Sequence, residues 1–426
     1  MKVLVCITVL LLTAITHALA VDKPLGSFSA SGAGTTSIYS NPNLRGVLLR
    51  VSWSQIETAP GTFNFTTLDN QVANVTSRGK SWSLAVLGGG LGSPAWLIDP
   101  VTSGGLGAAY ITYSFRGVPN YRLPLIWDAT VQDRLAQLAN KLAERYNTNT
   151  SLKLVYVTQM TANGIEGHLQ GVTMSTLVAA GNDQDGDSDV DAVDFALNWI
   201  AGSKAAARSF ALAFTNKALA FEVHDVNGTS TIPETIINDL WNDASLGQRV
   251  GAAMWWISGK TTYQTQLVNV LSAFPGDIYG QVIGPSYDGP WLASTSYSQG
   301  TIRMPVNPPA TQRYRYEATT AGVSGTTEPV WPTTINGTVQ DGTVVWTCRD
   351  SQFPNGDYTQ VFAQAKTLGM RYIEPWETEF STGSSSANGQ WDATLTDFNS
   401  WADATFNDGN TAPTIASIAN QTTTTG

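Results

Sequence analysis

The sequence predicts an α/β fold, a closed (β/α)8 TIM barrel with a small all-β module inserted in a late loop between a strand and a helix. Short apolar runs alternate with amphipathic helical runs along most of the 426 residues, as expected for repeated βα units. The apolar runs are nearly continuous, which is typical of parallel strands buried on both faces. Residues 288–350 break this rhythm, because they are rich in Thr, Pro and Gly and show no helical pattern.

The expected elements follow one another in chain order. Strands are expected at Leu25–Ala30, the candidate for the first strand, and then at Gly46–Trp53, Ser81–Leu87, Leu152–Gln159, Ala218–His224, Val250–Ile257, Asp277–Gly284 and Arg371–Pro375. Helices are expected at Asp133–Tyr146, Val193–Phe214, Pro233–Asn242, Tyr263–Ala273 and Tyr358–Leu368. Because the last of these helices resumes the pattern after the inserted segment, the barrel is expected to comprise residues 21–287 and 351–408.

The composition indicates an aromatic-rich surface of low charge. Charged residues make up 13% of the chain, aromatic residues 10%, and there are 14 Trp. Such a surface is typical of proteins that handle uncharged polar polymers, so a carbohydrate is the expected partner. The net charge of −10 argues against nucleic acid and anionic membranes as partners.

The first 20 residues resemble a secretory signal peptide. Lys2 precedes an apolar run over residues 3–15, and Ala18-Leu19-Ala20 fits the small-residue cleavage rule. The apolar run is too short for a membrane-spanning helix, so we expect a secreted protein, extracellular or periplasmic, with no membrane insertion. Cleavage would leave Cys348 alone, and the core would then stabilise the fold without an internal disulfide.

The chemistry is expected at the end of the last strand. Pro375 removes a backbone donor, so the strand cannot continue as a central one beyond Glu374. Trp376 and Glu377 follow, and a carboxylate at a strand end beside an indole that can stack on a sugar is a common glycosidase arrangement. The alternative is a solvated acidic turn.

Several stretches of the first third of the chain carry a resemblance to a known family. They are Gly46–Trp53, Gln55–Glu57, Pro60–Phe65, Ser93–Leu97 and Leu123–Asp128. Together they resemble the beginning of a clan A glycoside hydrolase barrel, most closely the family 42 β-galactosidases. The resemblance implies hydrolysis of O-glycosidic bonds by two carboxylates, with Trp53 and Trp96 among the sugar-binding residues. Glu57 is expected to be a structural loop residue.

The same resemblance implies which carboxylates act. The clan places its general acid/base after strand four, where Thr158–His168 lies, and Glu166 is the matching carboxylate. Glu374 would be the nucleophile of a retaining mechanism, which requires a separation of ~5 Å between the two carboxyl groups. Asn163 does not directly precede Glu166, unlike the family's usual Asn-Glu pair. Asn163 and His168 are expected substrate contacts, although His168 could instead bind the carboxylate or be structural.

The strand count conflicts with this assignment. Glu374 falls on the eighth strand, whereas the clan usually has its nucleophile on the seventh, and Asp277–Gly284 carries no acid near its end. Either the count is off by one, or the pair is unusual, or the barrel has lost activity. Glu222 is the reserve nucleophile and Glu377 a further one.

Three other side chains are candidate substrate contacts. Glu222 and His224 share one face of a strand, because side chains alternate along it, and that face could line the barrel mouth. Trp255 ends the next strand and could form the floor of a sugar subsite. The alternative is that this indole packs under the helices.

An acidic segment has the oxygen spacing of a calcium-binding loop. Its carboxylates are Asp183, Asp185, Asp187, Asp189 and Asp194. Such loops usually need glycine where Ser188 stands. No cofactor is expected to be required, and a structural Ca²⁺ is possible. The alternative is a solvated acidic loop that opens the helix at Val193.

The inserted segment 288–350 resembles a small β module of bacterial extracellular enzymes and phage tail proteins. Its marks include Trp291, Glu328-Pro329, Trp331-Pro332 and Val345–Cys348. The resemblance implies carbohydrate binding, and the alternative is a small aromatic core. Residues 409–426 resemble a linker with the start of an incomplete immunoglobulin-like repeat.

Two other functions stay open beside the hydrolase. The first is a non-catalytic glycan-binding or adhesive cell-surface protein that uses the barrel as a scaffold. The second is an interaction module of a phage or cell-surface assembly, which predicts oligomerisation through residues 288–350. The sugar, the linkage and the choice between exo and endo action do not follow from the sequence.

Overall fold

A computed structural model describes residues 21–30, 36–115, 118–260, 263–283, 290–306, 314–349, 358–376 and 392–406. The expected signal peptide, Glu377 and the tail 409–426 lie outside these ranges. No helix in the described ranges is both long and apolar enough to cross a lipid bilayer.

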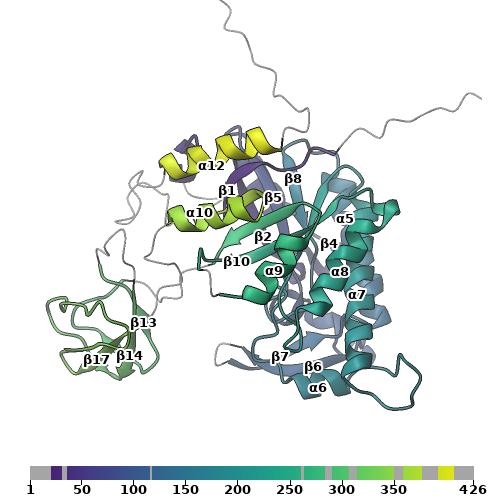
Figure 1. Cartoon of the computed structure of the whole chain (residues 1–426). Coiled ribbons are helices and arrows are strands. Elements are labelled where there is room, and N and C mark those ends of the chain that lie inside the picture. The colour runs from purple at the N-terminus through teal and green to yellow at the C-terminus, as the bar shows by residue number, and fades with distance from the viewer. Residues whose placement is uncertain are drawn as a thin grey trace, which may run out of the picture.

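Eight parallel strands form a closed barrel (Figure 1). In chain order they are β1 (Gly26–Ser29), β2 (Gly46–Ser52), β5 (Ser81–Leu87), β8 (Leu152–Tyr156), β9 (Ala218–Glu222), β10 (Val250–Ile257), β11 (Ile278–Val282) and β18 (Met370–Glu374). β1 pairs with both β2 and β18 and so closes the ring. The predicted barrel is confirmed, and the Leu25–Ala30 candidate is its first strand.

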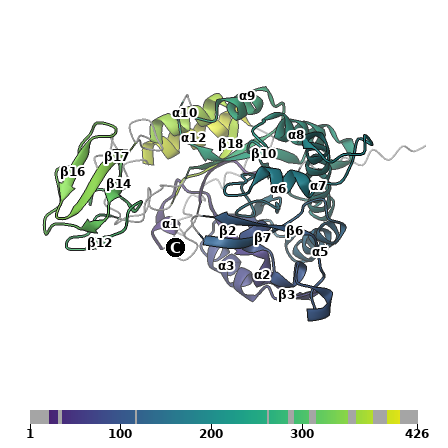
Figure 2. The same ribbon diagram turned by 90° about the horizontal axis from the view of Figure 1, so that it is seen from below.

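Helices follow the barrel strands and cover the outside of the barrel (Figures 1 and 2). They are α1 (Thr36–Ser40), α3 (Thr66–Thr76), α5 (Ala129–Tyr146), α7 (Ala192–Ala213), α8 (Thr231–Asn242), α9 (Thr265–Ala273), α10 (Tyr358–Thr367) and α12 (Asp392–Thr405). The N-terminus of α5 shows why a helix begins there: the Asp128 carboxylate accepts the Thr130 amide at 2.8 Å and caps the helix. Each helix expected from the sequence pattern is present.

The barrel interior is filled with side chains. Leu154 and Tyr156 of β8, Tyr279 of β11 and Tyr372 of β18 belong to one buried cluster inside the ring. This packing follows from the period of two along each strand, which turns every second side chain inward. Any site therefore lies at an end of the ring, and in this fold the reactive end is the one where the strands finish.

A β-hairpin after β5 extends one wall of that end. It consists of β6 (Tyr110–Phe115) and β7 (Val118–Pro124). Alternate β6 side chains are buried, ending with Tyr113 and Phe115. The Tyr113 hydroxyl donates to the Ala162 carbonyl and so ties the hairpin to the loop after β8.

Shorter elements complete the barrel part of the chain. They are α2 (Trp53–Ile56), β3 (Glu57–Ala59), β4 (Thr62–Phe63), α4 (Gly89–Gly92), η1 (Ala95–Leu97), η2 (Val101–Ser103), α6 (Met174–Ala179) and η3 (Ala244–Leu246).

The described residues between β11 and α10 form short antiparallel strands. The strands are β12 (Ser296–Tyr297), β13 (Ile302–Arg303), β14 (Arg315–Thr320), β15 (Gly322–Val323), β16 (Thr338–Asp341) and β17 (Val344–Arg349). They are arranged as a four-stranded sheet (β13-β14-β17-β16) and a two-stranded one (β12-β15). The Trp291 and Trp346 indoles both donate to one Asp341 oxygen, at 2.7 and 2.9 Å. Both indoles are buried, so the aromatic-core interpretation holds for them. The carbohydrate-binding role of this segment stays a prediction.

Candidate active site

The loop after β8 folds tightly around Glu166. The Glu166 backbone amide donates to Asn163 Oδ1 at 3.0 Å, and Asn163 Nδ2 donates to the Glu166 carboxylate oxygen Oε2 at 2.8 Å. Gly164 makes the turn possible, since its φ is +82° and an added Cβ would lie 2.0 Å from the Gly88 carbonyl oxygen. Asn163 was expected to contact substrate, and in the structure its amide holds the carboxylate.

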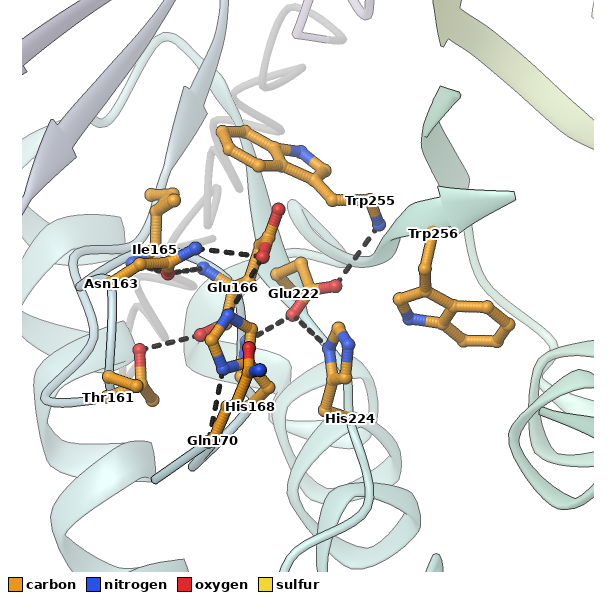
Figure 3. Close-up of polar contacts among 12 residues, drawn as sticks. Thr161, Asn163, Ile165, Glu166, His168, Gln170, Glu222, His224, Trp255 and Trp256 are labelled. Carbon is orange, nitrogen blue, oxygen red and sulfur yellow. Dashed lines mark hydrogen bonds and ion pairs between the residues drawn. The ribbon is translucent and has the colours of Figure 1, made fainter. Parts of the chain in front are cut away.

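Two histidines and a second glutamate continue this network (Figure 3). His168 Nε2 lies 3.0 Å from Glu166 Oε2. The His168 and His224 rings meet edge to face at 5.6 Å between centroids. His224 Nδ1 then lies 3.0 Å from Glu222 Oε2. The polar chain therefore runs from the rim of the barrel into its wall.

Glu222 serves the framework, which corrects its assignment as a substrate contact and reserve nucleophile. One carboxylate oxygen accepts the Trp255 amide at 3.1 Å, and the other accepts the Gly167 amide and faces His224. The residue is 1% exposed. The two backbone donors fasten the Glu166 loop to β9 and β10 through this carboxylate, which presents almost no surface to a sugar.

Glu374 lies inside the ring among neutral donors. Its Oε1 accepts the Tyr156 hydroxyl at 3.0 Å and the Tyr372 hydroxyl, and its Oε2 accepts Gln281 Nε2 at 2.6 Å. The residue is 0% exposed. In the described part of the chain, no cation lies within ion-pair distance of this carboxylate, so its charge is balanced only through hydrogen bonds and from further away.

Arg50 provides positive charge that acts on Glu374 from outside ion-pair distance. Its guanidinium lies 4.8 Å from the Trp255 ring centroid and 5.0 Å from that of Trp376, and Nη2 donates to Gln281 Oε1 at 2.8 Å. Burial lowers the pKa of Arg50, while the charges of Glu374 and Glu166 act in the opposite direction. The cation is therefore within electrostatic reach of both carboxylates.

The environments of the two carboxylates shift their pKa values in opposite directions. Burial raises the pKa of Glu374 from 4.5 to about 6, against its tyrosine and glutamine donors and Arg50. Burial also acts to raise the pKa of Glu166, but His168, His224 and Asn163 outweigh it and hold that pKa below 4.5. When these two carboxylates hold one proton between them, that proton therefore resides preferentially on Glu374.

The Glu222–His224 pair is also perturbed. Burial raises the pKa of Glu222, with the Glu166 charge adding to the effect and His224 opposing it. For His224, burial lowers the pKa, but the carboxylates of Glu222 and Glu166 outweigh burial, so the pKa of the imidazole is raised. A positive His224 between two glutamates would stabilise both of them in the ionised form.

Two tryptophans expected to bind sugar, Trp53 and Trp96, pack against each other and against Glu57, and Trp96 stays partly exposed. Trp53 is fully buried and its indole donates to Glu57 at 2.8 Å, so its assignment as a substrate contact is wrong. Trp96 packs edge-on against Trp53 at 6.3 Å and donates to the Glu57 carbonyl. Glu57 itself pairs with Arg134 and is 0% exposed, in line with its expected structural role.

The acidic segment folds back on its own carboxylates. Asp183, Asp185, Asp187 and Asp194 each place one oxygen within 4.8 Å of the others, and Asp189, Asp191 and Asp194 form a second such group. Asp194 also accepts the Gln184 and Asp191 amides and completes the capping box of α7. The proximity of Asp187 raises the pKa of Asp189. A calcium ion here stays a prediction.

Three site residues were not expected in the site from the sequence. They are Tyr156, Gln281 and Tyr372. A usable signal was present, since Tyr372 and Glu374 are two residues apart on one strand and must face the same side. Which residues of β2, β8 and β11 reach Glu374 depends on the relative stagger of the strands, and a single strand does not reveal that stagger.

Comparisons with known proteins give distant structural similarities. No protein-family profile and no curated protein matches the chain. One similar solved structure is the xylanase XynB from Paenibacillus barcinonensis complexed with a conduramine derivative, with 13% identity, coverage of 83% of each chain and a TM-score of 0.41. Another is an endo-1,4-beta-xylanase from Caldicellulosiruptor owensensis, with 9% identity, coverage of 62% of this chain and 71% of that one, and a TM-score of 0.37. Both TM-scores are below 0.5, so the barrel assignment depends on the strand pairing above.

Proposed function

We propose that the protein is a glycoside hydrolase whose site is the open end of the barrel around Glu166, Glu374 and Arg50. The supporting observation is that carboxylates from strand four's loop and strand eight reach the same end of the ring, with one arginine within electrostatic reach of both. The Arg50 guanidinium lies over the rings of both Trp255 and Trp376; Trp255 is buried, whereas Trp376 is partly exposed and is the indole that could stack on a sugar. The resemblance to clan A enzymes and the predicted secretion agree with this function.

In the proposed retaining reaction, Glu166 donates its proton to the glycosidic oxygen while the Glu374 carboxylate attacks the anomeric carbon. The bond to the leaving sugar breaks and a glycosyl ester forms on Glu374. Water then attacks the anomeric carbon, Glu166 takes the proton of that water, and the ester bond breaks. Tyr156, Tyr372 and Gln281 would hold the Glu374 carboxylate in one orientation throughout.

The resting pKa order has a consequence for this reaction. The reactive form needs a proton on Glu166 and a charge on Glu374, but the structure favours the reverse. The reactive form is then a minor species, most abundant between the two pKa values. Turnover is therefore expected to be highest in mildly acidic solution and to fall as the pH rises above about 6.

The direct test is a glycan screen with the purified protein beside Glu166→Gln and Glu374→Gln. Each substitution removes one reacting carboxylate and is expected to lower kcat by about 10³-fold or more. Glu144→Gln is the matched control, because Glu144 lies on the exposed face of α5, and its turnover is expected to equal that of the parent. Folded Glu166→Gln or Glu374→Gln protein with full turnover would contradict the proposed roles.

A non-catalytic glycan-binding barrel is the second candidate, and two observations favour it. Glu374 is 0% exposed, so a sugar reaches it only if side chains around it move. The seventh strand, where the clan usually has its nucleophile, carries Gln281. Binding of an oligosaccharide without release of product, in all variants alike, would support this candidate over the hydrolase.

A further inference from the structure

His168, at the mouth of the barrel, contacts both Glu166 and the β6–β7 hairpin. Its ring is 18% exposed and its Nε2 lies 3.0 Å from Glu166 Oε2. Its other nitrogen, Nδ1, lies 3.3 Å from the Gln170 amide, which donates to it. A nitrogen that accepts a backbone N–H carries no proton, so in the neutral ring the proton is on Nε2 and points at Glu166.

The ring is also fixed from a second βα unit. Phe115, at the end of β6, stacks on His168 with 5.9 Å between centroids and 19° between planes. The same hairpin is tied to the Glu166 loop by the hydrogen bond from Tyr113 to Ala162. Phe115 is buried, so the imidazole rests on a surface that is itself held in place.

We propose that His168 is a positioning residue for Glu166: an Nε2–H donor, held by Gln170 and by Phe115 of the β6–β7 hairpin, that fixes the orientation and the charge of this carboxylate. The assignment of Glu166 as acid/base comes from the proposed function, and the contact with His168 stands independently of it. Glycan that displaced this hydrogen bond would release Glu166 to take up the proton it must donate.

Other described groups also act on Glu166, and their effects have to be distinguished from the effect of His168. The titratable and charged ones are Arg50, Glu222, His224 and Tyr263, which sense the Glu166 charge. Of these, His224 acts on Glu166 in the same direction as His168. The decisive variant must therefore remove the His168 donor and leave His224 in place.

The test is a carbon-13 NMR titration of the full chain labelled at the glutamate carboxyl groups, with the Glu166 signal assigned by its loss in Glu166→Gln. His168→Phe keeps a flat ring against Phe115 and removes the donor, so the Glu166 midpoint is expected to rise by about one pH unit. His168→Gln keeps an N–H and is expected to shift the midpoint by less than half as much. Tyr110→Phe, on the exposed face of the hairpin, is the control without a shift.

Two outcomes would overturn the proposal. One is an unchanged Glu166 midpoint in folded His168→Phe. The other needs no substitution: nitrogen-15 NMR of the parent would show His168 protonated on Nδ1 instead of Nε2. Absence of turnover on every glycan would contradict the proposed hydrolase and leave both of these measurements standing. If turnover is found, the acid limb of kcat/KM should move upward with the Glu166 midpoint in His168→Phe.

Discussion

Glu57 and Glu374 are both 0% exposed, but they lie in regions of the molecule that treat a buried carboxylate differently. Glu57, outside the ring, pairs directly with Arg134 and accepts the Trp53 indole and the Gly61 amide, each at 2.8 Å. Glu374, inside the ring, receives neutral donors alone among the described residues and reaches Arg50 through Gln281.

The two environments differ in how strongly they stabilise a negative charge on the carboxylate. A direct cation and a fixed backbone donor stabilise the negative charge of a buried carboxylate strongly. Hydroxyl and amide donors stabilise the charge less, so burial raises the pKa of Glu374 to about 6. With a pKa of about 6, Glu374 gains and loses its proton in the pH range in which catalytic acids and bases work.

The largest effect is expected when the cation beside Glu57 is removed. Arg134→Met leaves a buried charge without its ion partner and should lower the free energy of unfolding by about 3–5 kcal/mol. Denaturation by urea at neutral pH measures the change. Lys141→Met is the control, since the Lys141–Glu144 pair on the same helix is exposed at 47% and 62% and should contribute under about 1 kcal/mol. Equal losses of unfolding free energy in the two variants would mean that the buried Arg134–Glu57 pair is worth no more than the exposed Lys141–Glu144 pair, contrary to this expectation.

Part of the fold and of the candidate site could be predicted from the sequence, and part could not. The eight strands follow from continuous apolar runs, and the place of Glu374 at the end of the last strand follows from Pro375. The same reasoning expected Trp53 at the sugar and Glu222 as a reserve nucleophile, because strand periodicity gives the face of a residue but not its neighbours. Burial of Trp53 by Glu57 and Trp96, and capture of Glu222 by the Gly167 amide, depend on loops that cross between strands.

A third region, the acidic loop before α7, has carboxylates with no cation partner in the described structure. Calcium would supply one, as Arg134 does for Glu57. We expect millimolar Ca²⁺ to raise the melting temperature and EGTA to reverse the change, with a stabilisation of about 2.7 kcal/mol at a concentration 100 times the Kd. Calorimetric titration measures the affinity. Asp187→Asn should weaken binding, and equal stability with Ca²⁺, Mg²⁺ and EGTA would contradict the calcium interpretation.

The smallest effect is expected at Glu374, and its sign is opposite to that at Arg134. Because the folded-state pKa is raised from 4.5 to about 6, the folded protein binds this proton more tightly than the unfolded chain does. The stabilisation is complete below pH 4.5 and is lost as the pH rises to about 6. At pH 7 the ionised carboxylate then destabilises the fold by up to about 2 kcal/mol.

Glu374→Gln keeps the shape and removes the charge, so it should restore up to about 2 kcal/mol of stability at pH 7 and change nothing at pH 4. Unfolding curves at the two pH values measure both differences, and Glu144→Gln is the exposed control. A side chain that stabilised the fold in its charged form would give the reverse result, a loss at pH 7. A gain in stability together with a loss of turnover would mean that the charge at the barrel mouth is retained for its chemistry, since the fold is more stable without it.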